Sequence, residues 1–305
     1  MKWIKRGLIY KPDGTRNWAR HGALQPTPFL FEEKIRVFVG LRDDDGVSSV
    51  GWVDLATDDP SRILGISEQP ALTAGDSGMF DENGVVPCSV VRIGSELWMS
   101  YAGYQLGHKV RFTVFGGLAV SGDGGHTFQR LSRVPFLDRA DEACLFRVAH
   151  TLMFEDGRWR VWYGAGSDFR AGSSKSVPVY DIRYFETTRL TDIPKMGRIV
   201  VPLAAGENRV ARPWVVRRPD GRYSMFYGFE TASTSYRLGH AESSDGITWT
   251  RRDEEFGLGV SEEGAWDCEM ISYPSVVSAA GRTVLFYNGN DYGRSGFGWA
   301  ELESW

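Results

Sequence analysis

The 305-residue chain lacks the features that would place it in a membrane, in a secretory route or on nucleic acid. No window approaches the run of about 18 apolar residues that a membrane-spanning helix needs. The first residues, MKWIKRGLIYKPDG, contain no apolar stretch long enough for a signal peptide. Basic residues never occur in runs longer than two, and the net charge is −4, so we expect no nucleic-acid partner and no membrane partner.

Cysteine is scarce, and the spacing of its three copies (Cys88, Cys144 and Cys268) fits neither a disulfide framework nor a metal site. An odd number of distant thiols is typical of a reducing compartment, so the sequence predicts a cytoplasmic protein. No metal ligands are assigned and no cofactor is expected. A central divalent cation such as calcium stays an alternative for which the sequence offers no ligand pattern.

Glycine and aromatic residues are abundant instead. The chain has 36 glycines, and 13% of its residues are aromatic. Glycines provide tight turns, and aromatic side chains suit both short strands and surfaces that stack on sugar rings. The 3.6-residue period of an amphipathic helix is weak throughout, which favours an all-β fold.

One sequence pattern recurs along the whole chain. Each copy has an apolar run, a turn, and an aromatic-rich run that ends at glycine, as in VAHTLMFEDGRWRVWYG (148–164) and ARPWVVRRPDGRYSMFYG (211–228). The other copies span 26–40, 86–103 and 272–289. In each copy, one residue shortly before the closing glycine marks the same position: Val39, Tyr101, Tyr163, Tyr227 and Tyr287. Successive marker residues are 62, 62, 64 and 60 residues apart. A period of this length is typical of repeat architectures.

Each copy has the turn signals of a β-hairpin, and two copies continue into an Asp-box turn, SGDGGHTF (121–128) and SSDGITW (243–249). In such a turn the aspartate accepts hydrogen bonds from backbone amides, so we interpret Asp123 and Asp245 as structural. Repeats of about four short antiparallel strands predict a β-propeller with five blades, forming a single domain over 1–305. We expect the segment 3–10 to pair with the strand that ends the chain and so close the ring. A β-sandwich or β-helix is the alternative, but a sandwich would not explain the period.

The expected geometry indicates where a site would lie. In a propeller the residues just before the first strand and just after the second strand of each blade converge on one face. Four carboxylates in the polar segments before first strands are therefore the catalytic candidates: Asp81, Glu269, Asp267 and Glu142. Asp81 and Glu269 belong to different copies, so we expect them to face one another across the channel. Asp267 and Glu269 share one side of an extended segment.

The same convergence selects candidates for substrate binding. Carboxylates and amides hydrogen-bond sugar hydroxyls, tyrosine and tryptophan stack on the C–H face of a sugar ring, and arginine binds an anionic substituent. The candidates are His21, Arg42, Tyr104, Arg147, Arg212, Glu230, Trp266, Tyr273 and Asn290. A carbohydrate or glycoconjugate is thus the expected partner.

Several motifs resemble those of the five-bladed propeller glycosidases. The repeats, the RP and YP steps at strand starts, and SSDGITW are similar to family 43 arabinanase/xylosidase-type enzymes, family 32 invertase-type enzymes and family 130 mannoside phosphorylases. GMFDENGVVP, RPWVV, WDCEMISYP and YNGNDYGRSGFGWAEL look more closely like a little-characterised bacterial glycosidase-like branch, often associated with surface-polysaccharide clusters. The resemblance spans nearly the full chain and implies a glycoside hydrolase with paired carboxylates in a central funnel.

The sequence departs from that family pattern at an important place. Families 32 and 43 usually place an aspartate directly before the first-strand proline of the first blade, whereas Gln25 and Thr27 precede the prolines here. The DEAC step at 141–144 is similar to the Glu-Cys step of the invertase-type acid. Glycoside hydrolysis needs one protonated and one ionised carboxyl, about 5 Å apart for retention and roughly 6.5–9.5 Å for inversion. A non-catalytic sugar-binding propeller, or a glycosyl phosphorylase or transferase whose arginines hold phosphate, are the alternatives.

Overall fold

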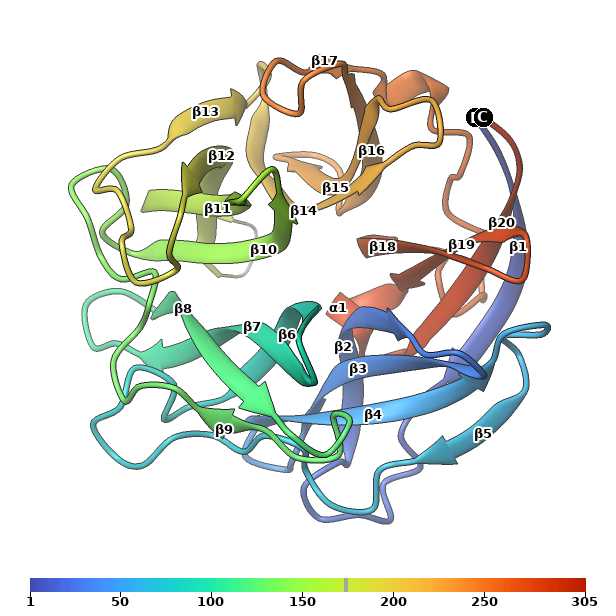
Figure 1. Ribbon diagram of the computed structural model, residues 1–305, viewed down its shortest axis with the longest axis horizontal. Coiled ribbons are helices and arrows are strands. Elements are labelled where there is room, and N and C mark those ends of the chain that lie inside the picture. Colours follow the sequence, from blue (N-terminus) through green and yellow to red (C-terminus); the bar gives the residue numbers. More distant parts are fainter. Residues whose placement is uncertain (173–174) are drawn as a thin grey trace.

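The computed structural model describes residues 1–172 and 175–305, and its regular secondary structure is almost entirely β-strand (Figure 1). The all-β expectation is confirmed. Two short helical segments interrupt the strands in the described residues, η1 (Asp253–Glu255) and α1 (Asn290–Gly293). Within the same residues, no helix has the length and apolar character needed to cross a membrane.

Antiparallel pairing of successive strands divides the chain into four-stranded units. The first unit contains β2 (His21–Leu30), β3 (Lys34–Arg42), β4 (Ser48–Ala56) and β5 (Ile63–Ile66). The second contains β6 (Val85–Ile93), β7 (Glu96–Leu106), β8 (Phe112–Ser121) and β9 (Gln129–Arg130). The third contains β10 (Phe146–Glu155), β11 (Arg158–Arg170), β12 (Val177–Thr187) and β13 (Arg198–Val201). The fourth contains β14 (Glu207–Arg217), β15 (Tyr223–Thr231), β16 (Arg237–Ser243) and β17 (Thr250–Arg251).

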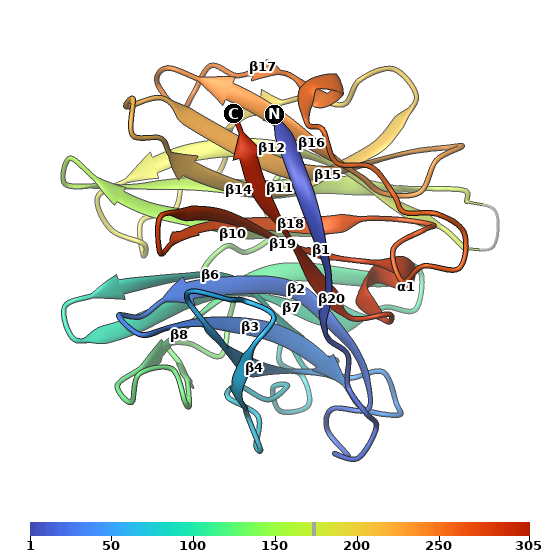
Figure 2. The ribbon, with the colours of Figure 1, turned by 90° about the vertical axis from the view of Figure 1, so that its right-hand side faces the viewer.

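The fifth unit combines the two ends of the chain. It contains β18 (Ser272–Ala279), β19 (Arg282–Asn288), β20 (Phe297–Ser304) and β1 (Lys2–Tyr10). The N-terminal strand β1 lies antiparallel to the C-terminal strand β20 along its whole length (Figure 2). The pairing expected for the segment 3–10 is therefore present.

The units meet one another near the middle of the molecule (Figure 1). Two short parallel contacts, β8 with β10 and β12 with β14, join the second, third and fourth units into one continuous sheet of twelve strands. The first and fifth units remain separate four-stranded sheets. The strands nearest the centre, one from each unit, are β2, β6, β10, β14 and β18 (Figure 1).

The hydrophobic core lies between the faces of neighbouring units. Phe38 of the first unit packs with Met99 of the second, and Leu118 of the second packs in a cluster with Val161 of the third. Further clusters join the third unit to the fourth and the fourth to the fifth. One more places Phe286 of the fifth unit against residues of the first. Each sheet therefore buries both faces, which accounts for the aromatic content of the repeats.

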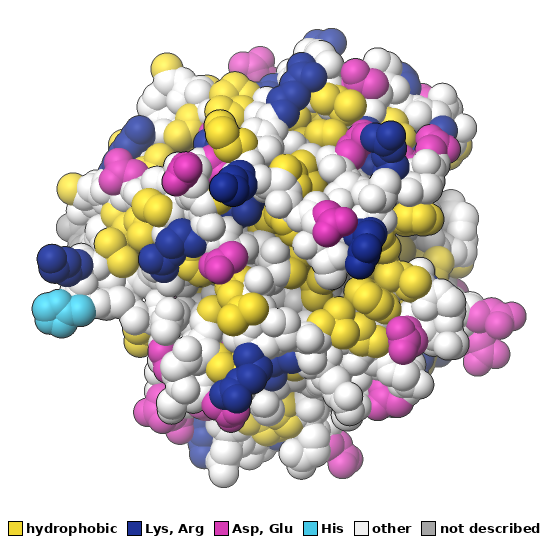
Figure 3. Space-filling model, turned by 60° about the vertical axis from the view of Figure 1, so that its left-hand side comes forward, with side chains coloured by type: hydrophobic (Ala, Val, Ile, Leu, Met, Phe, Trp, Pro, Cys, Tyr) yellow, Lys and Arg dark blue, Asp and Glu magenta, His cyan; other side chains and the backbone are white. Residues whose placement is uncertain are grey.

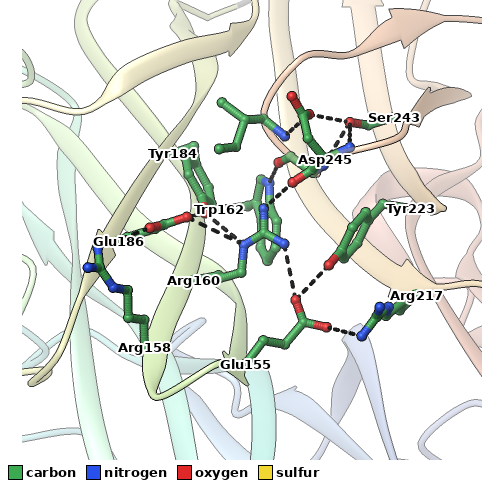
Figure 4. A network of polar contacts seen from close by, with 12 residues as sticks. Glu155, Arg158, Arg160, Trp162, Tyr184, Glu186, Arg217, Tyr223, Ser243 and Asp245 are labelled. Carbon is green, nitrogen blue, oxygen red and sulfur yellow. Dashed lines mark hydrogen bonds and ion pairs between the residues drawn. The ribbon is translucent and has the colours of Figure 1, made fainter. Parts of the chain in front are cut away.

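A polar network also connects the third and fourth units (Figure 4). Arg160 on β11 donates to the Tyr184 hydroxyl at 2.7 Å, to the Glu155 carboxylate at 3.0 Å, and to the backbone oxygen of Asp245 in the second Asp box. Its guanidinium lies 4.8 Å from the ring centre of Tyr223. The Asp box thus contacts the unit before it.

The first Asp box has the same relation to the first unit. Arg36 on β3 donates to Asp54 and, at 3.1 Å, to the backbone oxygen of Gly124. Within that turn Asp123 accepts hydrogen bonds from Ser121 and Thr127. Although burial acts to raise its pKa, these hydrogen bonds lower the pKa of Asp123 to about 2. The structural role expected for the Asp boxes matches these contacts.

Candidate functional site

A cavity of about 390 Å³ lies where the innermost strands meet. All five units contribute to its wall, with representative residues Leu24 on β2, Tyr104 on β7, Phe146 on β10, Arg209 on β14 and Tyr273 on β18. This volume is within the usual range of small-molecule sites, and a position at the junction of several elements is typical of them. It is the candidate functional site.

Irregular pairing near the middle of the innermost strands aims several side chains at this cavity. The register of β2, β14 and β18 shifts at Gln25, Arg212 and Tyr273, each of which is followed by proline. Their φ angles are 53°, 52° and 55°, in the left-handed region that non-glycine residues seldom occupy. Such bulges tolerate proline and redirect the side chain, so three units share the same irregularity in the backbone.

Arg212 lines the cavity and is 1% exposed. It donates to the Gln25 side chain at 3.2 Å, to the Thr27 hydroxyl at 2.7 Å, and to backbone oxygens that include that of Tyr273. No carboxylate of the described residues pairs with it, and burial lowers its pKa to about 10. Neutral oxygens alone therefore surround a buried cation.

His150 occupies the corresponding bulge of β10 and also lines the cavity. It is 9% exposed, and its Nδ1 atom is buried without a hydrogen-bond partner in the described part of the chain. Burial and the nearby charge of Arg212 lower its pKa to about 3, so the ring is neutral. Its second-unit counterpart, Cys88, is fully buried, and burial raises its pKa to about 12. Cys88 is thus an inert thiol.

Arg209 forms a second cationic centre on the wall. It is bonded to the Glu230 carboxylate and donates to the Tyr292 hydroxyl at 3.1 Å. Its guanidinium lies 4.7 Å from the ring centre of Tyr236, whose hydroxyl is 2.9 Å from that of Tyr180. The tyrosines hold this arginine in place and present hydroxyl groups near the cavity.

The four catalytic candidates do not line this cavity, and this corrects the sequence-based expectation. Asp81 is 0% exposed and accepts hydrogen bonds from Tyr101 at 3.1 Å and Arg130 at 2.8 Å. Glu269 is exposed, and only its backbone atoms form the hydrogen bonds found in the described residues. These two carboxylates do not face one another across the channel.

Glu142 and Asp267 are also drawn away from the centre. Glu142 accepts from Tyr163 at 2.7 Å, and Asp267 accepts from Tyr287 at 3.0 Å. The physical reason is common to these sites, because the buried tyrosines on β7, β11 and β19 each require an acceptor and a carboxylate from a neighbouring loop supplies it. In the fourth unit Tyr227 donates to Asp253 in the same way.

The binding candidates divide into two groups. Arg42, Tyr104, Arg212 and Tyr273 line the cavity. The remaining candidates do not appear in its wall: His21, Arg147, Glu230, Trp266 and Asn290. His21 borders an adjoining hollow of about 240 Å³, where its Nε2 atom is 3.0 Å from Asp44. Glu230 does not line the cavity but accepts hydrogen bonds from Arg209, which does.

The other three have structural contacts. Arg147 is 3% exposed and donates to Glu142 at 2.9 Å. Trp266 stacks on Tyr287 with ring centres 5.2 Å apart. Asn290 accepts from the backbone of Glu269 at 2.8 Å and thereby orders the loop before β18. These contacts explain why polar residues precede the innermost strands without lining a site.

Sequence reasoning missed several wall residues: Gln25, His150, Tyr180 and Tyr292. It considered Arg209 only as one of the arginines that could hold phosphate. A signal existed for Gln25, because it shares the position before proline with Arg212 and Tyr273. His150 has no following proline to mark its bulge. Tyr180 comes from a third strand, β12, which the expected geometry did not include.

The described residues contain no group of three or more His, Cys, Asp or Glu side chains placed to hold a metal ion. All three cysteines are free. Neither observation tests the predicted cytoplasmic location, which stays a prediction.

No known protein-family model matches this sequence. Two proteins of Mycobacterium tuberculosis are 35% identical over 309 residues, covering 100% of both chains in each comparison. They are the uncharacterized protein Rv1502 of strain ATCC 25618 / H37Rv and the uncharacterized protein MT1551 of strain CDC 1551 / Oshkosh.

Solved structures with the same fold include several glycoside hydrolases. A structure reported for the GH130 family of mannoside phosphorylases, which contains glycoside hydrolases that target β-1,2 mannosidic linkages in Candida mannan, has a TM-score of 0.74 at 14% identity, covering 98% of this chain and 93% of the other. A thermostable family-43 glycoside hydrolase has a TM-score of 0.68 at 15% identity, covering 96% of this chain and 91% of the other. A glycosyl hydrolase from Bacteroides ovatus has a TM-score of 0.70 at 14% identity, covering 99% of this chain and 90% of the other.

Proposed function

This chain belongs to one family with Rv1502 and MT1551 and has the fold of the glycosidase-like propeller group, and from that premise we propose that it binds a carbohydrate in its central cavity. The observation that carries the proposal is the composition of the cavity wall. Tyr104, Tyr273 and Tyr292 provide hydroxyl groups beside the guanidinium groups, while Phe112 and Phe146 provide apolar surface. Sugars need both, because their hydroxyls require hydrogen bonds and their C–H faces pack on apolar or aromatic groups.

The proposal includes a ring of five blades, one for each four-stranded unit, closed by β1 within a single domain over 1–305. The five interunit clusters of apolar side chains support it, since one of them joins the fifth unit to the first. The pairing of β1 with β20 also supports closure, because it completes the fifth unit from the opposite end of the chain.

We do not propose hydrolysis by a pair of carboxylates. That mechanism requires two carboxyl groups on opposite sides of the scissile bond. Among the described residues that line the cavity, the only carboxylate is that of Asp291, and its side chain is 59% exposed at the mouth. Of the functions considered from the sequence, sugar binding without this chemistry agrees best with the wall.

The test uses a glycan array followed by calorimetry on the glycans that the protein retains. Tyr104→Phe and Tyr292→Phe each remove one hydroxyl from the wall and leave the ring in place. We expect each variant to bind its glycan about fivefold more weakly, the effect of losing one hydrogen bond worth about 1 kcal/mol.

Tyr223→Phe is the matched control, because its hydroxyl donates to Glu155 at 2.7 Å in the network of Figure 4, away from the cavity wall. Its glycan affinity should equal that of the unmodified protein. Failure to retain any glycan would contradict the proposed function. Glycan binding that survives the double variant Tyr104→Phe/Tyr292→Phe unchanged would place the sugar outside this cavity.

A further inference from the structure

The charge of the cavity wall is opposite to that of the whole protein. The chain has a net charge of −4, and acidic and basic side chains are interspersed on the face shown in Figure 3. The described cavity wall instead contains one carboxylate, Asp291, and five cationic side chains: Arg42, Arg111, Lys175, Arg209 and Arg212. Counting Glu230 behind Arg209 as a second negative charge still leaves three positive charges in excess.

The charge of Arg212 is uncompensated. Within the described residues, every hydrogen bond of its guanidinium goes to a neutral oxygen. A buried ionised group without a counter-ion is costly, and a nearby anion would offset that cost. His150 is neutral, and burial raises the pKa of the Cys88 thiol to about 12, so neither neighbour supplies negative charge.

Two further arginines that line the cavity with Tyr104 have free donors. The Arg42 side chain makes no hydrogen bond or ion pair within the described residues, although it lines the cavity. Arg209 uses Nε and Nη2 for Glu230 and Tyr292, which leaves Nη1 without a bond in the same part of the chain. Burial raises the pKa of the Tyr104 hydroxyl to about 12, but the charges of Arg42 and Arg209 both act on it in the opposite direction. Both guanidinium groups line the same cavity as this hydroxyl.

We propose that the sugar bound in the cavity carries an anionic group, a carboxylate or a phosphate, that is held by Arg42 and Arg209 beside Tyr104. The proposal rests on the proposed function and names its class of ligand. Guanidinium groups bind carboxylate and phosphate through short charge-assisted hydrogen bonds, and the excess positive charge of the cavity attracts such a ligand from solution. A site for neutral sugars would have no need of the unpaired arginines.

The experiment compares acidic glycans with neutral counterparts of the same linkage on one array, including glucuronic and galacturonic acid glycans against glucose and galactose glycans, and sugar phosphates against the free sugars. Calorimetry then measures the retained pairs with Arg42→Gln. We expect the unmodified protein to bind the acidic member at least about tenfold more tightly, and Arg42→Gln to remove about tenfold of that preference. Affinity for the acidic member should also fall as salt is raised.

Arg189→Gln is the matched control, because its side chain is 73% exposed and its 4.0 Å contact with Asp192 lies outside the cavity wall. It should retain the preference for acidic glycans. Equal binding of acidic and neutral glycans would overturn the anionic ligand while leaving the proposed sugar site intact. Inorganic phosphate that binds alone, without competing with the acidic glycan, would overturn the assignment of these arginines to a sugar-borne anion. Binding of no glycan at all would overturn both proposals.

Discussion

Burial keeps two histidines of this protein in the neutral form. His150 borders the cavity, and His240 is 2% exposed between the fourth unit and its neighbours. Each has one ring nitrogen buried without a hydrogen-bond partner in the described residues. Burial, together with nearby cations such as Arg212 and Arg218, lowers both pKa values from 6.5 to about 3. The folded protein thus holds both rings in the neutral form.

This burial makes the stability depend on pH. Between the unfolded pKa of about 6.5 and the folded pKa of about 3, the unfolded chain binds protons that the folded chain does not. The contribution of these histidines to the free energy of unfolding should therefore be fully present above pH 6.5. It should fall as the pH drops, by up to about 1.4 kcal/mol per pH unit for each histidine. Urea unfolding at several pH values between 7 and 4.5 measures this slope.

Substitution distinguishes the contribution of the two histidines to this pH dependence from that of other titratable groups. His150→Gln and His240→Gln should each make the slope between pH 6.5 and 4.5 shallower, whatever their effect on stability at pH 7. His108→Gln changes an exposed histidine and should leave the slope unchanged. A slope that persists in both buried-site variants would mean that other groups titrate in this window.

At the scale of elements, the second strands β3 and β11 connect neighbouring units through arginine. Arg36 and Arg160 each contact an aromatic ring, a carboxylate and the backbone of the Asp-box turn in the following unit. The turn is rigid because its aspartate accepts several hydrogen bonds, so it presents a fixed backbone oxygen to the arginine. This relation connects the first unit to the second and the third to the fourth.

Arg160→Ala should destabilise the protein by about 2–4 kcal/mol, because it leaves buried acceptors of the network without donors and removes a side chain packed among aromatic rings. The free energy of urea unfolding measures the loss. Arg158→Ala, two residues away on the same strand, is the control, because its side chain is 63% exposed and pairs with Glu186 at 3.6 Å. It should change stability by no more than about 0.5 kcal/mol. Equal effects of the two variants would contradict a role for the network.

At the scale of the whole molecule, the N-terminal strand β1 connects the first and last parts of the chain. Its backbone pairs with β20, Lys5 donates to the buried Asp267 at 2.6 Å, and Trp3 packs against Phe226 and Phe256 of the fourth unit. Strand β1 therefore covers the edge of β20 and also contacts the neighbouring unit.

Deletion of residues 1–10 should lower the melting temperature by roughly 5–10 °C, through the loss of buried aromatic packing, and should promote association through the uncovered edge of β20. Thermal unfolding and size-exclusion chromatography measure the two effects. Lys2→Ala, which removes an exposed ion pair with Glu303, is the control and should behave like the unmodified protein. A truncated chain that stays monomeric with an unchanged melting temperature would argue against closure by β1.

Much of the architecture follows from local sequence patterns. Alternating strands, turn residues and the interval between Tyr101, Tyr163, Tyr227 and Tyr287 predict the repeated hairpins. The Asp boxes and the pairing of the chain ends were also predictable, because turn chemistry and strand patterning act over short segments. The polar segments before the innermost strands are recognisable in the sequence, but Asp81 and Asp267 within them accept hydrogen bonds from buried tyrosines and do not line the cavity.

The sequence by itself determined the all-β class, the repeat and the strand pairing of the termini, since these depend on periodicity and backbone hydrogen bonding. Only the tertiary structure decided which side chains reach the cavity. A buried tyrosine hydroxyl requires an acceptor, so Asp81 and Asp267 turn into the interior, whereas bulges with positive φ direct Arg212 and Tyr273 to the centre. Both outcomes depend on contacts between segments far apart in the chain, which a local pattern does not specify.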